Sequence, residues 1–230
     1  MVRMIPTGCG SLDKVLDGGL HPGDVTLVYG EAETGKTSLA IQCAVNAVRL
    51  GCKVIFIDSD GSFSPRRLAQ IAGHDLNEVA PQITLIKPMT FQEQALAVDR
   101  LDAYLTPQIC LVVVDTVTSL YRAEFNESKE KTFKLNRELG NQLANVAQLA
   151  RTRKIAVLLT SQVRNVFVQD LVSVEPVGTR VLLFWSDTVL SLRPADRRST
   201  VKAVLEKHGG NARRLDCYFS IEENGIRDCH

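Results

Sequence analysis

The stretch LVYGEAETGKTSLAIQ, from Leu27 to Gln42, decides the fold of this chain. An apolar run ends in Gly30, a short loop follows, and Lys36 and Thr37 open an amphipathic helical pattern. The loop fits G-x-x-x-x-G-K-[ST], in which glycines let backbone N–H groups curl around a phosphate. The helix after it presents free N–H groups and a partial positive charge to the same anion. The sequence therefore predicts a strand, a phosphate-binding loop and a helix in succession.

The predicted loop supplies most of a nucleotide site with ATP and Mg²⁺ as cofactors. Lys36 is expected to reach the β- and γ-phosphates and Thr37 to ligate Mg²⁺. Asp115 ends the apolar strand CLVVVD and is the second expected metal-binding group, because ligands collect at the carboxyl ends of parallel strands. The predicted nucleotide-binding residues of this segment are Gly30, Glu31, Ala32, Glu33, Thr34, Gly35, Lys36, Thr37 and Ser38.

Polar residues also follow two further predicted strands. Asp58 and Asp60 come after a buried strand, and Asp60 is the better candidate for polarising the attacking water. A turn role beside Gly61 is equally compatible with the local sequence, since Asp-Gly is a common turn pair. Gln162, after the strand ending at Thr160, has an amide that can sense a γ-phosphate, although local sequence alone favours a solvated loop residue.

Strand-like apolar runs alternate with helical patterns along the chain. The predicted strands are Val25–Tyr29, Val54–Ile57, Ile83–Ile86, Cys110–Asp115 and Ile155–Thr160, and the predicted helices include Pro65–Ala72, Phe91–Leu105 and Thr132–Thr152. This pattern predicts an α/β fold with a mostly parallel sheet flanked by helices. After Arg180 the segments DTVLSLR, TVKAVLEKH and CYFSIEENG predict a mostly antiparallel extension of that sheet. We expect a single domain over residues 1–230.

Composition narrows the functional class. The 230 residues carry a net charge of +1, so binding to nucleic acid requires a local basic patch. No apolar run is long enough to cross a bilayer, which argues against a membrane role. The six cysteines contain no C-x-x-C pair, and we expect buried thiols in a reducing cytoplasm.

Several segments resemble the RecA-type recombinases, and in particular the archaeal RadA-like proteins. The resemblance rests on PTGCGSLDKVLDGGLHPGDVTLVYGEAETGKTS, FIDSDGSFSPRRL, LVVVDTVTSLYR and TSQV, and it extends over nearly the whole chain. It implies a RecA-like ATPase core, with Asp60 in the place of the catalytic glutamate and Lys36 as a catalytic group. It further implies that Arg67 lies near the adenine and that Gln162 couples the nucleotide state to a DNA-binding loop.

Two departures from the family pattern shape the expected activity. Ser59-Asp60-Gly61 replaces Thr-Glu-Gly, and the shorter carboxylate predicts slow ATP hydrolysis. The chain also lacks room before Pro6 for the family's N-terminal DNA-binding domain and its Phe-x-x-Ala polymerisation segment, as in a core-only archaeal paralogue. We therefore expect an accessory protein of recombination with little strand exchange. The expected partners are single-stranded or branched DNA and a RadA-like recombinase or other recombination proteins, with at most a weak homo-oligomer.

The resemblance places DNA-facing loops at about residues 122–134 and 164–180, where Phe167 is a candidate for base stacking. Basic residues around the first loop and in the C-terminal region form a plausible footprint for DNA phosphates. They are Arg122, Lys129, Lys131, Lys134, Arg137, Arg193, Arg197, Arg198, Lys202, Lys207, Arg213 and Arg214. The first of these runs alternates acids and bases, which is also typical of a solvated helix face.

Three other functions stay open from the sequence. A DNA-dependent ATPase motor predicts strong stimulation of turnover by single-stranded DNA. A signalling ATPase of the same superfamily shares the residues before the phosphate loop, but SFSPRRL and TSQV argue against it. A scaffold that keeps ATP only for folding predicts that mutation of Lys36 leaves partner binding intact.

Overall fold

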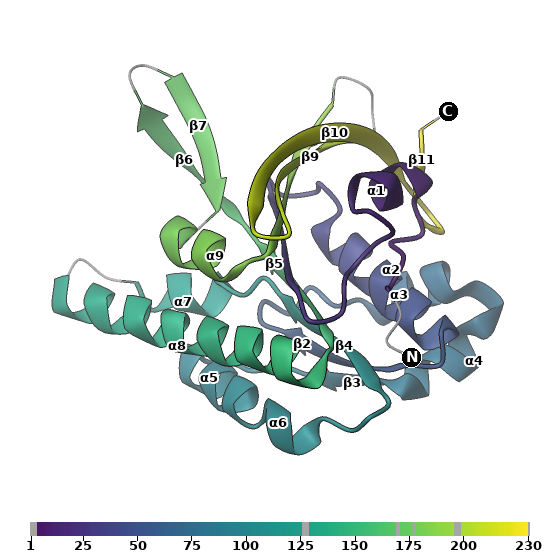
Figure 1. The fold of residues 1–230 in the computed structure, drawn as a ribbon, viewed down its shortest axis with the longest axis horizontal. Helices are drawn as coiled ribbons and strands as arrows, with labels where there is room; N and C mark the ends of the chain where they lie inside the picture. Colours follow the sequence, from purple (N-terminus) through teal and green to yellow (C-terminus); the bar gives the residue numbers. More distant parts are fainter. Residues whose placement is uncertain (1–3, 126–128, 169–170, 177, 196–198, 230) are drawn as a thin grey trace.

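A computed structural model of the chain describes residues 4–125, 129–168, 171–176, 178–195 and 199–229 (Figure 1). The main sheet has the strand order β11-β10-β9-β8-β1-β5-β4-β2-β3, and β6 and β7 form a separate hairpin. The strands are β1 (Val25–Gly30), β2 (Lys53–Asp58), β3 (Ile83–Ile86), β4 (Ile109–Asp115), β5 (Ala156–Ser161), β6 (Val163–Val168), β7 (Leu171–Pro176), β8 (Thr188–Pro194), β9 (Thr200–His208), β10 (Asn211–Glu222) and β11 (Gly225–Asp228).

Helices cover both faces of the sheet. They are α1 (Gly10–Val15), α2 (Lys36–Arg49), α3 (Pro65–Ala72), α4 (Leu76–Val79), α5 (Phe91–Asp99), α6 (Leu101–Tyr104), α7 (Ser119–Ala123), α8 (Lys129–Arg153) and α9 (Thr179–Trp185), with short 3₁₀ turns at Gly73–Asp75 and Ala80–Gln82. The apolar residues of α1, α2 and α3 form one core cluster with the sheet, and those of α5, α8 and α9 form another. Figure 1 shows these two groups of helices on opposite sides of the sheet. None of the described helices combines the length and the apolar character needed to cross a bilayer.

The predicted α/β architecture is confirmed. Strands β1, β2, β3, β4 and β5 pair in parallel, and β1 and β5 are buried along their whole length. Burial on both faces explains why these strands read as continuous apolar runs rather than as alternating ones. The parallel arrangement brings the residues that follow Tyr29, Ile57 and Val114 to one edge of the sheet, where the candidate site lies.

Three details of the fold differ from the sequence prediction. Strand β8 pairs in parallel with β1, so the antiparallel extension begins only at the β8–β9 pair. Residues 164–180 were predicted as a loop, but Val163–Pro176 includes the antiparallel β6–β7 hairpin, which projects from the body in Figure 1. The helix predicted over 91–105 is divided at Arg100, and α8 starts three residues earlier than predicted, at Lys129.

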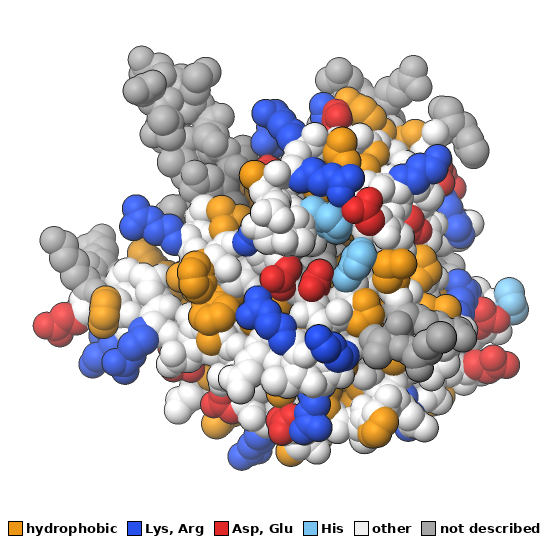
Figure 2. All heavy atoms as spheres, viewed as in Figure 1, with side chains coloured by type: hydrophobic (Ala, Val, Ile, Leu, Met, Phe, Trp, Pro, Cys, Tyr) orange, Lys and Arg blue, Asp and Glu red, His pale blue; other side chains and the backbone are white. Residues whose placement is uncertain are grey.

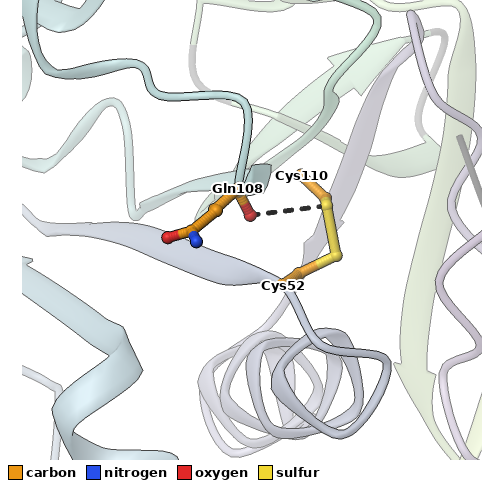
Figure 3. The surroundings of a disulfide bond; sticks show 3 residues. All are labelled: Cys52, Gln108 and Cys110. Carbon is orange, nitrogen blue, oxygen red and sulfur yellow. Dashed lines mark hydrogen bonds between the residues drawn. A yellow bond between two sulfur atoms is a disulfide. The ribbon is translucent and has the colours of Figure 1, made fainter.

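The expectation of six buried thiols is wrong, because Cys52 and Cys110 form a disulfide (Figure 3). Cys52 immediately precedes β2, and Cys110 lies on the neighbouring strand β4. The parallel β2–β4 pairing places the two Cα atoms 5.7 Å apart, within the range that a disulfide requires. Among the other cysteines, Cys9 and Cys43 are buried free thiols, whereas Cys229 is exposed.

Candidate functional site

The phosphate-loop motif forms the predicted turn between β1 and α2. Gly30 is tightly enclosed, since a Cβ at this position would lie 2.4 Å from the carbonyl oxygen of Leu192. Gly35 has a φ of 82° and precedes the first residue of α2. The side chain of Thr34 is buried and donates to the carbonyl of Glu31, which closes the loop on itself. The closed loop therefore leads directly into the N-terminus of α2, the end of a helix at which anions bind.

The Lys36 side chain is held inside the curve of this loop. Its ammonium group donates to the carbonyls of Gly30 at 2.9 Å and Glu31 at 2.6 Å. Burial lowers the pKa of Lys36, and the nearby carboxylate of Asp115 opposes that shift most strongly. The ammonium is thus positioned next to the loop before any phosphate arrives.

Asp115, at the end of β4, lies at the centre of a ring of hydroxyl groups. Its Oδ2 accepts hydrogen bonds from Thr37 at 2.8 Å and Ser62 at 2.9 Å, and its Oδ1 accepts one from Thr160 at 2.5 Å. Burial raises the pKa of Asp115, while the three hydroxyl donors lower it, with Thr160 the strongest of them. The predicted pair of Thr37 and Asp115 is therefore in direct contact.

The carboxylates that follow β2 complete an acidic cluster. Oxygens of Asp58, Asp60 and Asp115 all lie within 4.8 Å of one another. Asp58 is buried and Asp60 is exposed, so only Asp60 offers its carboxylate to solvent. The backbone N–H of Ser62 is shared between Oδ1 of Asp58 at 3.0 Å and Oδ1 of Asp60 at 3.2 Å.

Arg67, on α3, contacts both the phosphate-loop helix α2 and the turn between β10 and β11. Its Nε donates to Ser38, and its Nη1 donates to the backbone carbonyls of Glu222 and Glu223 in the β10–β11 turn. Nη2 is buried without a hydrogen-bond partner among the described residues. Burial also lowers the pKa of Arg67. An unsatisfied guanidinium donor beside Ser38 is consistent with a ligand group that is absent here.

The side chain of Gln162 hydrogen-bonds to α7 rather than to the acidic cluster. Its Oε1 accepts a 2.8 Å hydrogen bond from Arg122 in α7, and the next residue, Val163, begins β6. The residue therefore joins the first predicted DNA loop to the base of the hairpin. Phe167 and Arg164 belong to the residues whose side chains lie outside the described part of the structure, as do Lys129, Arg197 and Arg198.

A basic groove lies on the strands of the C-terminal extension. It has a volume of about 550 Å³ and is lined by Arg193, Lys202, Val204, Glu206, Ala212, Arg213 and Arg214. Figure 2 shows Lys and Arg side chains gathered over the region of β9 and β10. Lys207, which the sequence analysis included in the DNA footprint, does not line this groove. Its ammonium instead donates to the carbonyls of Leu183 and Ser186 at the end of α9.

An apolar cleft lies at the opposite end of the sheet, against the edge strand β3. Its volume is about 540 Å³, and its lining residues are Ile55, Thr84, Ile86, Glu93, Leu96, Ala97, Arg100, Tyr104 and Ile109. Leu96 on α5 and Tyr104 on α6 are 47% and 54% exposed, so the walls of the cleft include large side chains open to solvent. Because β3 ends the strand order, one side of it has no neighbouring strand within the described sheet.

Sequence reasoning missed two hydroxyl residues that donate to Asp115 and the backbone carbonyls that bind Arg67. Ser62 and Thr160 were not predicted as site residues, although both are hydroxyl residues next to predicted strand ends. The carbonyls of the β10–β11 turn were not predicted because a backbone acceptor leaves no trace in residue type. By contrast, Lys36, Thr37, Asp60 and Asp115 lie together as predicted.

Comparison with known proteins finds relatives that match nearly the full length of the chain. The sequence matches the Rad51 family over residues 1–229. It is 36% identical to the DNA repair and recombination protein RadB of Thermococcus gammatolerans over 228 residues, covering 98% of this chain and 99% of the relative. It is 34% identical to the protein of that name from Methanococcus maripaludis (strain C7), over 94% of this chain and 96% of the relative. A crystal structure of the RadB recombinase, with 35% identity, superposes with a TM-score of 0.83 over 99% of this chain and 100% of that one.

Proposed function

The chain belongs to the Rad51 family, and from that premise we propose that it is an ATP-binding and DNA-binding accessory protein of homologous recombination and DNA repair. In this proposal it hydrolyses ATP slowly and performs little or no strand exchange alone. The relatives named for DNA repair and recombination support this role. The observation that carries it is the contact between Thr37 of the phosphate loop and Asp115 inside the acidic cluster.

The residues of the cluster fit a magnesium–nucleotide complex. Mg²⁺ is usually held by one or two carboxylates together with waters and substrate phosphates, and Asp115 and Thr37 supply matching oxygen donors. When bound, Mg²⁺ neutralises charge on the β- and γ-phosphates. In this proposal Lys36 binds the phosphates from the loop side, and Arg67 lies near the adenine. In this proposal Gln162 couples the nucleotide state to the hairpin, which begins at the next residue, and its bond with Arg122 ties it to α7.

We assign the basic groove on β8, β9 and β10 to the DNA phosphate backbone. Lys202 is already paired with Asp216, and Arg213 is paired with Asp17. Arg193 and Arg214 make no ion pair within the described ranges, so they are the groove cations most available to DNA. Phosphate contacts of this kind bind without sequence preference and weaken steeply with salt.

Removing both available cations is expected to weaken binding of single-stranded DNA and to flatten its salt dependence. For Arg193→Ala combined with Arg214→Ala, the slope of log K against log salt should fall by about 0.7 for each lost phosphate contact. A salt series of anisotropy measurements with a labelled oligonucleotide gives this slope directly. The control, Lys14→Ala with Lys53→Ala, removes two exposed charges outside the groove. Equal slopes for the two double variants would exclude the groove as a DNA site.

For the protein partner, we propose that the apolar cleft beside β3 accepts the Phe-x-x-Ala segment of a RadA-like recombinase. An extended peptide can add to the free edge of β3 by main-chain hydrogen bonds while its aromatic side chain fills the cleft. Leu96 and Tyr104 supply the exposed apolar walls that such a side chain needs. The chain would then present a socket to the recombinase without polymerising itself.

Leu96→Glu is expected to weaken binding of such a peptide by at least about tenfold, since losing the burial of one aromatic side chain costs about 1.5–3 kcal/mol. The measurement is the anisotropy of a labelled Phe-x-x-Ala peptide. Leu215→Glu is a matched control, because Leu215 on β10 is 39% exposed and lies outside the cleft. If the two variants bind the peptide equally well, the recombinase docks elsewhere.

A further inference from the structure

Ser62 occupies a position in the acidic cluster that no part of the phosphate-loop motif explains. Its hydroxyl donates to Oδ2 of Asp115 at 2.9 Å and lies 3.2 Å from the hydroxyl of Thr37. These two oxygens are the ones assigned above to the magnesium complex. A third oxygen donor therefore stands within hydrogen-bond distance of both expected metal-binding side chains.

The backbone around Ser62 is fixed by a buried carboxylate. Asp58 accepts from the N–H of Ser62 at 3.0 Å and from the N–H of Phe63 at 3.2 Å, and Lys87 lies 3.6 Å from its Oδ2. Two amides and one ammonium thus compensate the charge of Asp58. Asp58 therefore fixes the backbone of the loop, whereas Asp115 and the hydroxyl groups around it are the groups assigned to the magnesium–nucleotide complex.

The same loop contains an unsatisfied polar group. Ser59 is 2% exposed, its N–H donates to the carbonyl of Asp115, and its hydroxyl has no partner among the described residues. Buried hydroxyls are usually hydrogen-bonded, so a group missing from this structure, such as water, is expected in this region. Within the segment from Asp58 to Phe63, the Ser59 hydroxyl therefore remains able to donate to a ligand of the site.

We propose that Ser62 is a positioning residue for the magnesium shell. In this role its hydroxyl holds the Asp115 carboxylate, and a water of the shell, in the orientation that Mg²⁺ requires. The inference rests on the proposed nucleotide function and extends it, because it gives the Asp58–Phe63 loop a dependence on the metal. Outer-shell partners of this kind typically contribute 10–100-fold to metal affinity.

The test measures how much Mg²⁺ is needed for binding of a fluorescent ATP analogue. Ser62→Val should raise the half-saturating Mg²⁺ concentration about tenfold or more. Ser62→Thr, which has the same shape as valine but keeps the hydroxyl, should restore the wild-type value. Binding of the analogue in excess EDTA should be the same for all three proteins, because the hydroxyl acts only through the metal.

The outcomes separate this inference from the function on which it rests. If the wild-type protein does not bind the Mg²⁺ complex at all, the nucleotide proposal fails and this one with it. If the wild-type protein binds and both variants match it, only the role of Ser62 is wrong. Equal weakening of both variants, with or without Mg²⁺, would mean that Ser62 is needed only for the shape of the loop. Ser11→Ala, which removes a hydroxyl at α1, should leave the Mg²⁺ requirement unchanged.

Discussion

Replacing Lys36 by alanine is expected to weaken binding of Mg²⁺–ATP by about 100-fold. The ammonium group is held within the loop by the carbonyls of Gly30 and Glu31, so it pays little ordering cost when phosphate binds. Truncating one member of a buried charge pair costs about 2–5 kcal/mol. A cost of about 2.8 kcal/mol, in the lower half of that range, corresponds to about 100-fold in the dissociation constant. Isothermal titration of wild type and Lys36→Ala with Mg²⁺–ATP measures the difference.

Two controls keep this result interpretable. Lys53→Ala removes an exposed lysine at the start of β2, at the other end of the strand from Asp58, and should leave ATP affinity unchanged. Thermal unfolding without nucleotide shows whether loss of the two loop hydrogen bonds disturbs the fold. A folded Lys36→Ala protein with wild-type affinity would contradict the assignment of the loop. Retained partner binding in a variant that no longer binds ATP would instead favour the scaffold function.

The fold and the phosphate site were predictable because their signals are local. A buried parallel strand reads as a continuous apolar run, as in Val54–Ile57, and a phosphate loop needs glycines at fixed spacing. Asp115 follows the most apolar strand, and the parallel sheet brings its carboxylate to Thr37. The strands and the loop are each specified within a short stretch, and the contact between Thr37 and Asp115 follows because ligands collect at the carboxyl ends of parallel strands.

The features that were missed depend on contacts between distant segments. The Cys52–Cys110 disulfide spans 58 residues and follows from the pairing of β2 with β4, which residue spacing does not reveal. Whether β8 runs parallel or antiparallel to β1 is likewise decided by the path of the chain around the sheet. The β6–β7 hairpin is different, because VRNVFV is rich in the β-branched and aromatic residues typical of strands, a local signal that the loop prediction did not use.

Replacing Asp60 by glutamate is expected to speed ATP hydrolysis, by up to about 100-fold. The Asp60 carboxylate is exposed and held toward its own loop by the N–H of Ser62 at 3.2 Å. One additional methylene moves the carboxylate outward by about 1 Å, and a displacement of that size can change a rate by about 100-fold. Single-turnover hydrolysis at saturating ATP and Mg²⁺ measures the chemical step separately from binding.

The matched variant Asp60→Asn keeps the length and the acceptor for the N–H of Ser62 but removes the charge that polarises water. It should hydrolyse ATP more slowly than wild type while binding Mg²⁺–ATP with similar affinity. If Asp60→Glu binds ATP normally yet hydrolyses it no faster, the short carboxylate is not what limits the rate. Asp60 would then be a turn residue beside Gly61. The hydroxyl groups that bind Asp115 would be the next candidates for the residues that limit the hydrolysis rate. If single-stranded DNA strongly stimulates hydrolysis by the wild-type protein, the site is complete and needs DNA for activation. That result would favour the DNA-dependent ATPase motor.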